Sequence, residues 1–394
     1  MTFHKSTAPS WRASTIAGCS TTSGRSSTPA TRVAPDKGRG CTVPTLERRV
    51  LPGLDKEVSV IGAGCWTIGG PAANNGVPIG WDDVDPHEAF AALLKAHELG
   101  VTFYDTADVY GLGRSERLLG RLVREVGRDG LIISSKVGYF AGTGPHPYHP
   151  DQMRHQLNTT LANLSTDHLD AYFFHSNDFG DDDRYLADAI KLMHKWHADG
   201  IIGAIGIRAP HVFAQQWADG DGQHSAESAR FLKLFQDIAP DVVQARFNLL
   251  SPLYGPDETD IFAFARLHGV GVLIKQALGQ GVLLGGYDPD RPPTFSHTDH
   301  RSTDPAFTAE ALRVASTKLA PLRDRFGHDP AALVRVVLRY VLQSAPDSIV
   351  LTGFRHAAQI HTNVTCLGNP LTDDELVEIR TLLHSTTHEE GDLT

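Results

Sequence analysis

Short apolar runs alternate with amphipathic segments along the chain from residue 58 onward. The amphipathic segments repeat apolar residues at the i, i+3, i+4 spacing of a helix, as Met153, Leu157 and Leu161 do. One further helix is predicted to run from Pro86 and to stop at Gly100, because proline favours the first turn and glycine the residue after the last. Eight apolar runs are predicted as strands, over residues 58–62, 101–104, 131–134, 171–174, 204–207, 242–244, 270–274 and 348–351.

This alternation predicts an α/β fold. Strands that alternate with helices form a parallel sheet, and right-handed crossovers let eight such units close into a (β/α)8 TIM barrel. We expect a single barrel domain over residues 53–385 and a C-terminal tail at 386–394. Residues 287–327 form an unusually long connection with a helix of its own near 305–326, and we expect it to lie over one barrel mouth.

Residues 1–52 differ in composition from the rest of the chain. Between Ser10 and Ala34 the sequence is rich in Ser, Thr, Ala and Arg, without Asp, Glu or apolar periodicity. Such a segment cannot bury enough surface to offset the entropy of ordering, so we expect a flexible arm. The same composition is typical of an organelle transit peptide. We favour a dispensable extension of a cytoplasmic protein.

The composition limits the possible partners. The formal net charge of −10 argues against nucleic acid and anionic membranes, since both would repel the chain. No apolar run approaches the roughly 20 residues of a membrane-spanning helix. The four cysteines are scattered, and His194 and His197 have no evident third ligand, so neither a disulfide framework nor a metal site is predicted. The oligomeric state stays open.

Two interpretations compete for Gly62 and Gly64, which follow the first apolar run. The pair resembles the start of the dinucleotide fingerprint G-x-G-x-x-G, but Thr67 replaces the third glycine. The Gly-Gly-Pro that comes next would not propagate the helix that holds a pyrophosphate. The same glycines suit a loop at a barrel mouth, where backbone must approach a ligand closely. We favour the barrel loop.

Four polar residues lie at or just beyond the ends of successive predicted strands: Asp105, Tyr110, Lys136 and His175. The C-terminal ends of barrel strands converge on one mouth, where the active sites of such barrels are found. Carbonyl reduction needs a hydride at carbon and a proton at oxygen. A phenol is a poor proton donor at its ordinary pKa of about 10, and a nearby ammonium is expected to lower that pKa. Singly, each residue is explained as a cap, a packed ring or a solvated charge, but together they indicate catalysis.

Residues 100–111, which contain Asp105 and Tyr110, resemble the signature of the aldo-keto reductase family, and residues 115–120 are similar to its continuation. Lys136 and His175 lie where that family has the other members of its tetrad. The resemblance implies that Tyr110 is the general acid in reduction, that Lys136 tunes it, that Asp105 supports Lys136 and that His175 orients the substrate. It also implies NADPH bound extended across the barrel mouth, without a Rossmann domain.

The resemblance extends to cofactor and substrate contacts. Arg355 would pair with a 2′-phosphate, which NADP has and NAD lacks, and Gln359 and Asn363 would face the adenine from one side of a helix. The implied cofactor-binding set is Cys65, Trp66, Asp105, Gln244, Lys275, Gln276, Leu278, Gln280, Gly353, Arg355, Gln359 and Asn363. The substrate-binding set is Trp66, Tyr110, Tyr139 and His175.

Three positions depart from the family pattern. Arg208 and Ala209 stand where the family commonly has Ser-Asn, so Gln244 would hold the nicotinamide amide alone unless Arg208 takes a new role. Lys275 stands where relatives often have a tyrosine stacked on the nicotinamide. An ammonium does not stack as a ring does, although it can meet the pyrophosphate.

The residues therefore predict an NADPH-dependent oxidoreductase that reduces the carbonyl of an aldehyde, ketone or keto-sugar, with Tyr110 as general acid. Because the chemistry is reversible, alcohol oxidation fits the same residues. The altered nicotinamide contacts keep a second interpretation open, a cofactor-sensing regulatory or interaction subunit on the same fold.

Overall fold

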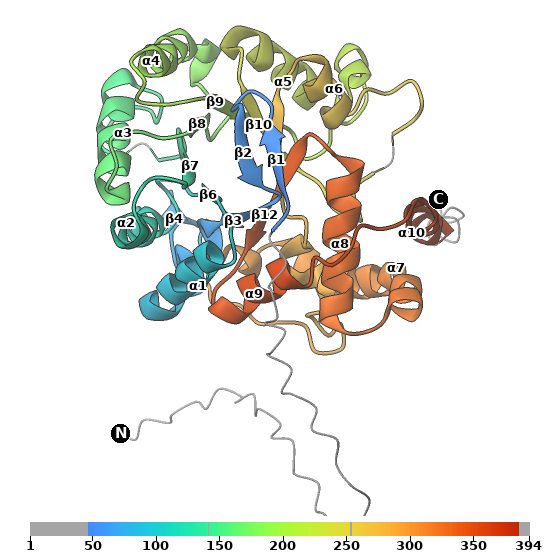
Figure 1. Ribbon diagram of the computed structural model, residues 1–394. Coiled ribbons are helices and arrows are strands. Elements are labelled where there is room, and N and C mark those ends of the chain that lie inside the picture. The colour runs from blue at the N-terminus through green and yellow to red at the C-terminus, as the bar shows by residue number, and fades with distance from the viewer. Residues whose placement is uncertain (1–45, 141, 253, 386–394) are drawn as a thin grey trace, which may run out of the picture. The chain divides into compact units, whose positions relative to one another are not determined.

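The computed structural model describes residues 46–140, 142–252 and 254–385, so the predictions for residues 1–45 and for the tail lie outside it. Eight parallel strands close into a barrel, and the pairing of the last strand with the first completes the ring (Figure 1). The predicted (β/α)8 fold is confirmed. In order around the barrel the strands are β3 (Ile61–Gly64), β6 (Phe103–Asp105), β7 (Ile132–Val137), β8 (Ala171–Phe174), β9 (Ile205–Arg208), β10 (Val242–Arg246), β11 (Gly271–Lys275) and β12 (Ser348–Gly353).

Helices surround the barrel, as Figure 1 shows. The predicted start of the first is confirmed: Pro86 opens it, and the Asp85 carboxylate accepts hydrogen bonds from two backbone N–H groups of its first turn. The helices are α1 (Pro86–Glu98), α2 (Arg114–Val126), α3 (Pro150–Leu164), α4 (Leu186–Ala198), α5 (Ser225–Ile238), α6 (Ile261–Leu267), α7 (Ala309–Phe326), α8 (Pro330–Ser344), α9 (Ala357–Thr365) and α10 (Asp373–Ser385).

The prediction for the first barrel strand is wrong in position. Val58 belongs to β2 (Lys56–Ser59), which pairs antiparallel with β1 (Arg48–Leu51), and the barrel strand β3 starts only at Ile61. The apolar residues of β2 and β3 follow one another so closely that periodicity alone does not separate them. Strand β1 lies in the part that the composition assigned to the arm, so ordered structure begins earlier than predicted.

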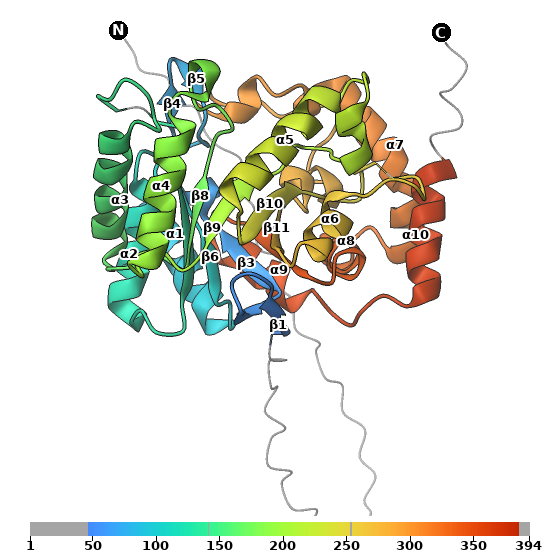
Figure 2. The same ribbon diagram turned by 90° about the horizontal axis from the view of Figure 1, so that it is seen from above.

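The hairpin β1–β2 closes one end of the barrel. Leu51, Leu54 and Val58 pack with Phe103 and Phe173, whose side chains point into the barrel, in a buried cluster of their own. Figure 2 shows β1 at one end and the short strands β4 (Ala73–Asn74) and β5 (Val77–Pro78) at the other. A ligand therefore has to enter from the end opposite the hairpin, where the barrel strands finish.

Close packing of α2 on α3 gives a stability prediction at Gly120. A Cβ there would lie 2.0 Å from the carbonyl oxygen of Asn163 and 2.9 Å from the carbonyl carbon of Leu164. Both atoms are backbone, so the helices would have to separate, and Gly120→Ala is expected to lower the free energy of unfolding by about 1–3 kcal/mol. Chemical denaturation measures the loss. The control is Gly222→Ala, where a Cβ meets no atom within 4 Å; equal losses in the two variants would contradict the packing argument.

Within residues 46–140, 142–252 and 254–385, no helix combines the length and apolarity needed to cross a membrane. The same part of the chain contains no group of three His, Cys, Asp or Glu side chains arranged to hold a metal ion.

Candidate active site

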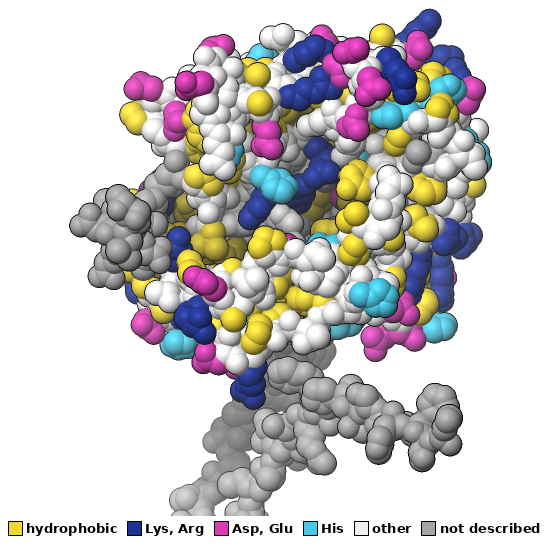
Figure 3. Space-filling view, turned by 180° about the vertical axis from the view of Figure 1, so that it is seen from behind, with side chains coloured by type: hydrophobic (Ala, Val, Ile, Leu, Met, Phe, Trp, Pro, Cys, Tyr) yellow, Lys and Arg dark blue, Asp and Glu magenta, His cyan; other side chains and the backbone are white. Residues whose placement is uncertain are grey.

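The structure brings together the four polar residues at the strand ends. Asp105 is the last residue of β6, Lys136 lies in β7, and His175 directly follows β8. Tyr110 lies in the loop between β6 and α2. Seen from the side opposite the hairpin, this end is hollowed, and Lys, Arg and His side chains are visible in and around the hollow (Figure 3).

Lys136 and Asp105 form a buried ion pair. The Lys136 ammonium donates to both Asp105 carboxylate oxygens, at 2.8 and 2.7 Å, and to the Thr106 carbonyl at 2.6 Å. The Ser134 hydroxyl donates a further hydrogen bond to Asp105. Burial disfavours the charged amine, but Asp105 and Tyr110 outweigh it and raise the pKa of Lys136 above its ordinary value. Lys136 is thus a fixed cation below the barrel mouth.

Tyr110 lies against this cation. The Lys136 nitrogen is 4.9 Å from the centroid of the phenol ring. Burial raises the pKa of Tyr110, and the lowering by Lys136 only partly offsets it. Lys136 thus lowers the pKa of the phenol as expected, but the burial of Tyr110 raises that pKa by more, so it stays above its ordinary value. At neutral pH the phenol keeps its proton, which is the form that donates.

His175 faces the phenol from the end of β8, two strands farther around the barrel than β6. Its ring centroid is 5.9 Å from that of Tyr110 and 5.3 Å from that of Tyr139. Burial, and then the charges of Arg208 and Lys136, hold the pKa of His175 well below its ordinary value. The imidazole is thus neutral at neutral pH. Its Nδ1 is buried without a hydrogen-bond partner among the described residues, so the ring has capacity left for a ligand.

An aromatic wall continues the mouth beyond Tyr110. The Trp66 ring lies 6.1 Å from Tyr110, 5.5 Å from Trp81 and 4.3 Å from His300. His300 belongs to the long connection after β11, and its backbone N–H donates to the Gly80 carbonyl. The expectation that this connection lies at a barrel mouth is confirmed. Sequence reasoning missed Trp81 and His300, because only the fold brings their loops to Trp66.

Gln244 and the residues after β11 lie at the same mouth. Gln244 is buried in β10, and its amide donates to Asp105 at 3.4 Å. Lys275 ends β11, followed by Gln276, whose carbonyl accepts from Asn248. Positive φ angles at Gln276 and Gln280, with Leu278 between them, turn this backbone sharply.

The residues that follow β12 are hydrogen-bonded to side chains of the next helix, α9. The Gln359 side chain accepts from the Arg355 backbone N–H, and the buried Asn363 amide donates to the Gly353 carbonyl. The Arg355 guanidinium donates to the carbonyls of Asp82 and Asp83. These backbone carbonyls thus hold the Arg355 guanidinium close to the start of α9. Among the described residues, the guanidinium makes no hydrogen bond to a carboxylate side chain.

Cys65 is enclosed at the end of β3. Its side chain is fully buried, and its carbonyl accepts from the Ser115 hydroxyl. Burial raises the pKa of the thiol far above its ordinary value, so Cys65 is not a nucleophile. Of the adjacent residues Cys65 and Trp66, only Trp66 has its side chain in the aromatic wall.

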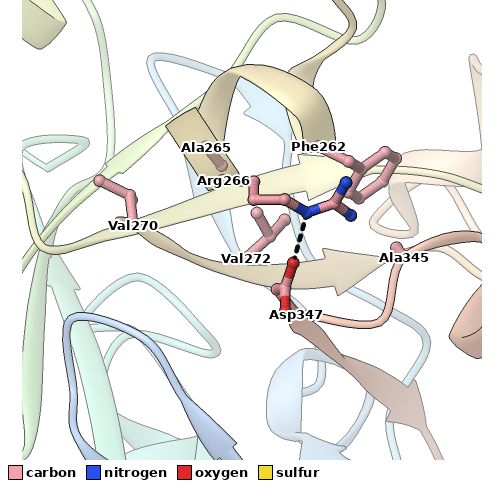
Figure 4. Close-up of a pocket in the computed structure, with 7 residues that line it drawn as sticks. All are labelled: Phe262, Ala265, Arg266, Val270, Val272, Ala345 and Asp347. Carbon is pink, nitrogen blue, oxygen red and sulfur yellow. Dashed lines mark hydrogen bonds and ion pairs between the residues drawn. The ribbon is translucent and has the colours of Figure 1, made fainter. Parts of the chain in front are cut away.

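A small pocket at the other end of the barrel has different chemistry. Figure 4 shows it where β11 and β12 begin, beside α6. The charged side chains on its wall, Arg266 and Asp347, form an ion pair at 2.8 Å and so satisfy each other. The lining residues are Phe262, Ala265, Arg266, Val270, Val272, Ala345 and Asp347. No titratable group there is left to carry out chemistry on a ligand.

A closed (β/α)8 barrel with these four polar residues at its C-terminal mouth defines a class of barrel oxidoreductases. The profile described as the Aldo/keto reductase family matches residues 60–384. The chain therefore belongs to this family, which places it among oxidoreductases that act on carbonyl groups.

Individual relatives are distant but nearly full-length. The NADH-specific methylglyoxal reductase of Escherichia coli (strain K12) is 23% identical over 347 residues, which cover 85% of this chain and 98% of that protein. A probable voltage-gated potassium channel subunit beta of Arabidopsis thaliana is 24% identical, with 78% of this chain and 87% of that protein covered. The glycerol dehydrogenase structure from Gluconobacter oxydans superposes with a TM-score of 0.65 at 24% identity and covers 88% of this chain and 98% of that one.

Proposed function

We propose that the protein is a nicotinamide-dependent reductase that converts the carbonyl of an aldehyde, ketone or keto-sugar to the alcohol, with Tyr110 as general acid. The observation that carries the proposal is the buried Lys136–Asp105 pair beside a protonated phenol and a neutral imidazole. These are the groups that carbonyl reduction requires at the oxygen.

The mouth fits a dinucleotide cofactor. Gln244 has an amide that can pair with a carboxamide, and the positive φ angles at Gln276 and Gln280 bend the backbone in a way that suits a phosphate-binding turn. Arg355 would hold the adenosine end. When bound, the cofactor supplies the hydride that a carbonyl carbon accepts.

The side chains account for the fate of the proton. Tyr110 O–H donates to the carbonyl oxygen as the carbon accepts the hydride, so a C–H and an O–H bond form and the C=O π bond breaks. The phenolate that remains is stabilised by Lys136, and it recovers its proton from solvent after the alcohol leaves. His175 donates a hydrogen bond to the same oxygen, which its neutral ring can do without adding charge. In the oxidation direction Tyr110 is the base.

NADPH is the proposed form of the cofactor, because the Arg355 guanidinium would pair with a 2′-phosphate. Arg355→Met is expected to weaken NADPH binding about ten- to a hundredfold, the worth of a hydrogen bond to a charged group. The NADH affinity should change far less. Quenching of tryptophan fluorescence measures both dissociation constants. Equal losses for the two cofactors would contradict the assignment and favour the NADH use named for the E. coli relative.

Turnover with a panel of aldehydes, ketones and keto-sugars tests the proposal, with loss of NADPH or NADH absorbance as the signal. We expect oxidation of the cofactor with at least one carbonyl class. The relative named as a channel subunit favours a second candidate, a cofactor-sensing subunit. Cofactor binding without oxidation by any carbonyl would contradict the reductase and support the subunit.

A further inference from the structure

Three neighbouring barrel strands end in cationic side chains. Arg208 ends β9, Arg246 ends β10 and Lys275 ends β11. Arg246 is directly opposite Lys275 in the parallel register, and Arg208 is opposite Gln244, two residues before Arg246. The barrel therefore gathers three cations on one side of the mouth, next to the Tyr110–His175 centre.

These cations lack counterions. Among the described residues, neither Lys275 nor Arg246 makes a side-chain hydrogen bond or ion pair. Arg208 donates to the His175 carbonyl at 3.0 Å, while its Nε is buried without a partner. Asp105, the carboxylate that acts on Lys275, is already paired with Lys136. Arg208 and Lys275 are partly buried and Arg246 is exposed, so the cluster presents unpaired positive charge to the mouth, where it would attract an anion.

The titration of the neighbouring groups agrees with this geometry. Burial, and then Arg208 and Lys136, hold the pKa of Lys275 well below its ordinary value. Burial together with Lys275, Arg246 and Arg208 lowers the pKa of His211 to about 4. The pKa values of Lys275 and His211 are thus both lowered by the positive charges around them, and a bound anion would reduce that repulsion.

We infer that Arg208, Arg246 and Lys275 form an anion site for the substrate, so that the preferred carbonyl compound carries a carboxylate or phosphate group. The inference rests on the proposed reduction and names its substrate class. The anion could belong to the substrate or to the cofactor, and the position of Arg208 favours the substrate. Its hydrogen bond to the His175 backbone fixes the guanidinium beside the imidazole that meets the carbonyl oxygen, whereas Arg355, which would pair with the 2′-phosphate, follows β12, three strands farther around the barrel.

Two aldehydes that differ only in an anionic group test the substrate class. Succinic semialdehyde has a carboxylate where butyraldehyde has a methyl group. The parent protein should show a kcat/KM about ten- to a hundredfold higher for succinic semialdehyde, the worth of one or two charge-assisted contacts. Lys275→Met should remove most of this preference, and Lys275→Arg, which keeps the charge, should retain most of it. Equal kcat/KM values for the two aldehydes in the parent would overturn the inference.

A measurement of cofactor binding distinguishes the two possible sources of the anion, the substrate and the cofactor's phosphates. The dissociation constant of NADPH is measured for the parent and Lys275→Met. A loss of NADPH affinity in the variant, with the aldehyde preference intact, would assign the cluster to the cofactor's phosphates and overturn the inference. A loss of the aldehyde preference with a much smaller change in NADPH affinity supports it.

Calorimetric titration of the cofactor-free protein with succinate distinguishes failure of the anion site from failure of the reductase. Succinate should bind the parent and bind Lys275→Met at least about tenfold more weakly. If neither aldehyde is reduced but succinate binds in this pattern, the proposed reduction fails and the anion site stands. If aldehydes are reduced without preference and succinate does not bind, the anion site fails and the reduction stands.

Discussion

Tyr110→Phe is expected to reduce the kcat for carbonyl reduction by about 10²–10⁴-fold, the usual contribution of a positioned general acid. The substitution removes only the hydroxyl. The ring that contacts Trp66 and His175 remains, so the fold and the affinity for NADPH should be preserved. Steady-state kinetics with the best carbonyl of the panel, together with a cofactor titration, measure both quantities.

Tyr340→Phe is the matched control, because it removes a phenol oxygen from α8, where the ring stacks on Phe247 in the main hydrophobic core and makes no ring contact with Tyr110 or His175 among the described residues. It should leave kcat nearly unchanged. If Tyr110→Phe turned over carbonyls as fast as Tyr340→Phe, Tyr110 would not be the proton donor.

The pH dependence of the reduction follows from the same phenol. Tyr110 donates its proton only below its pKa, and burial holds that pKa above the ordinary value. His175, with a lowered pKa, stays neutral down to acidic pH. The rate of reduction should therefore be level through neutral pH and fall only as the pH rises through the pKa of Tyr110. A fall centred near neutral pH would mean that another group donates the proton.

Lys136→Met is expected to destabilise the fold by about 3–5 kcal/mol, because removal of one partner leaves a buried charge uncompensated. Asp105 would keep Ser134 and Gln244 as donors but lose its cation. Carbonyl reduction should fall as well, since the phenolate left on Tyr110 would be unsupported. Thermal and chemical unfolding give the stability, and kinetics below the melting temperature give the rate.

The control for Lys136→Met is Lys195→Met, which breaks an exposed pair with Asp199 on α4. Exposed pairs contribute about 0–1 kcal/mol, so this variant should unfold almost like the parent. Similar stability of the two variants would show that the Lys136–Asp105 pair is not held in the buried arrangement described above.

The strand ends were predictable because the barrel topology is regular. Once eight strands are recognised, a polar residue at the end of each strand must reach the same mouth, and Asp105, Lys136 and His175 do so. The start of the barrel was less predictable. The apolar residues at the end of β2 and the start of β3 follow one another closely, and only the pairing of β2 with β1 shows which strand belongs to the barrel.

The electrostatics of the mouth could not be predicted from the sequence. The pKa of Tyr110 depends on how much water the packing removes, and that packing includes Trp66 and loops distant in sequence. Likewise, Arg208 and Lys275 were evident as departures from the family pattern, but their meeting beside Arg246 depends on the register of three strands. A local sequence pattern identifies the candidate residue, whereas the fold determines which charges surround it and how far it is buried.

Isotope transfer tests the central claim most directly. The protein is incubated with a reduced nicotinamide cofactor that carries deuterium at the transferable position of C4 and with the carbonyl that it turns over best. Mass spectrometry of the alcohol should find one deuterium on the former carbonyl carbon, and Tyr110→Phe should form that product far more slowly. An alcohol without deuterium, or no alcohol with any carbonyl while the cofactor binds, would contradict direct hydride transfer at this mouth.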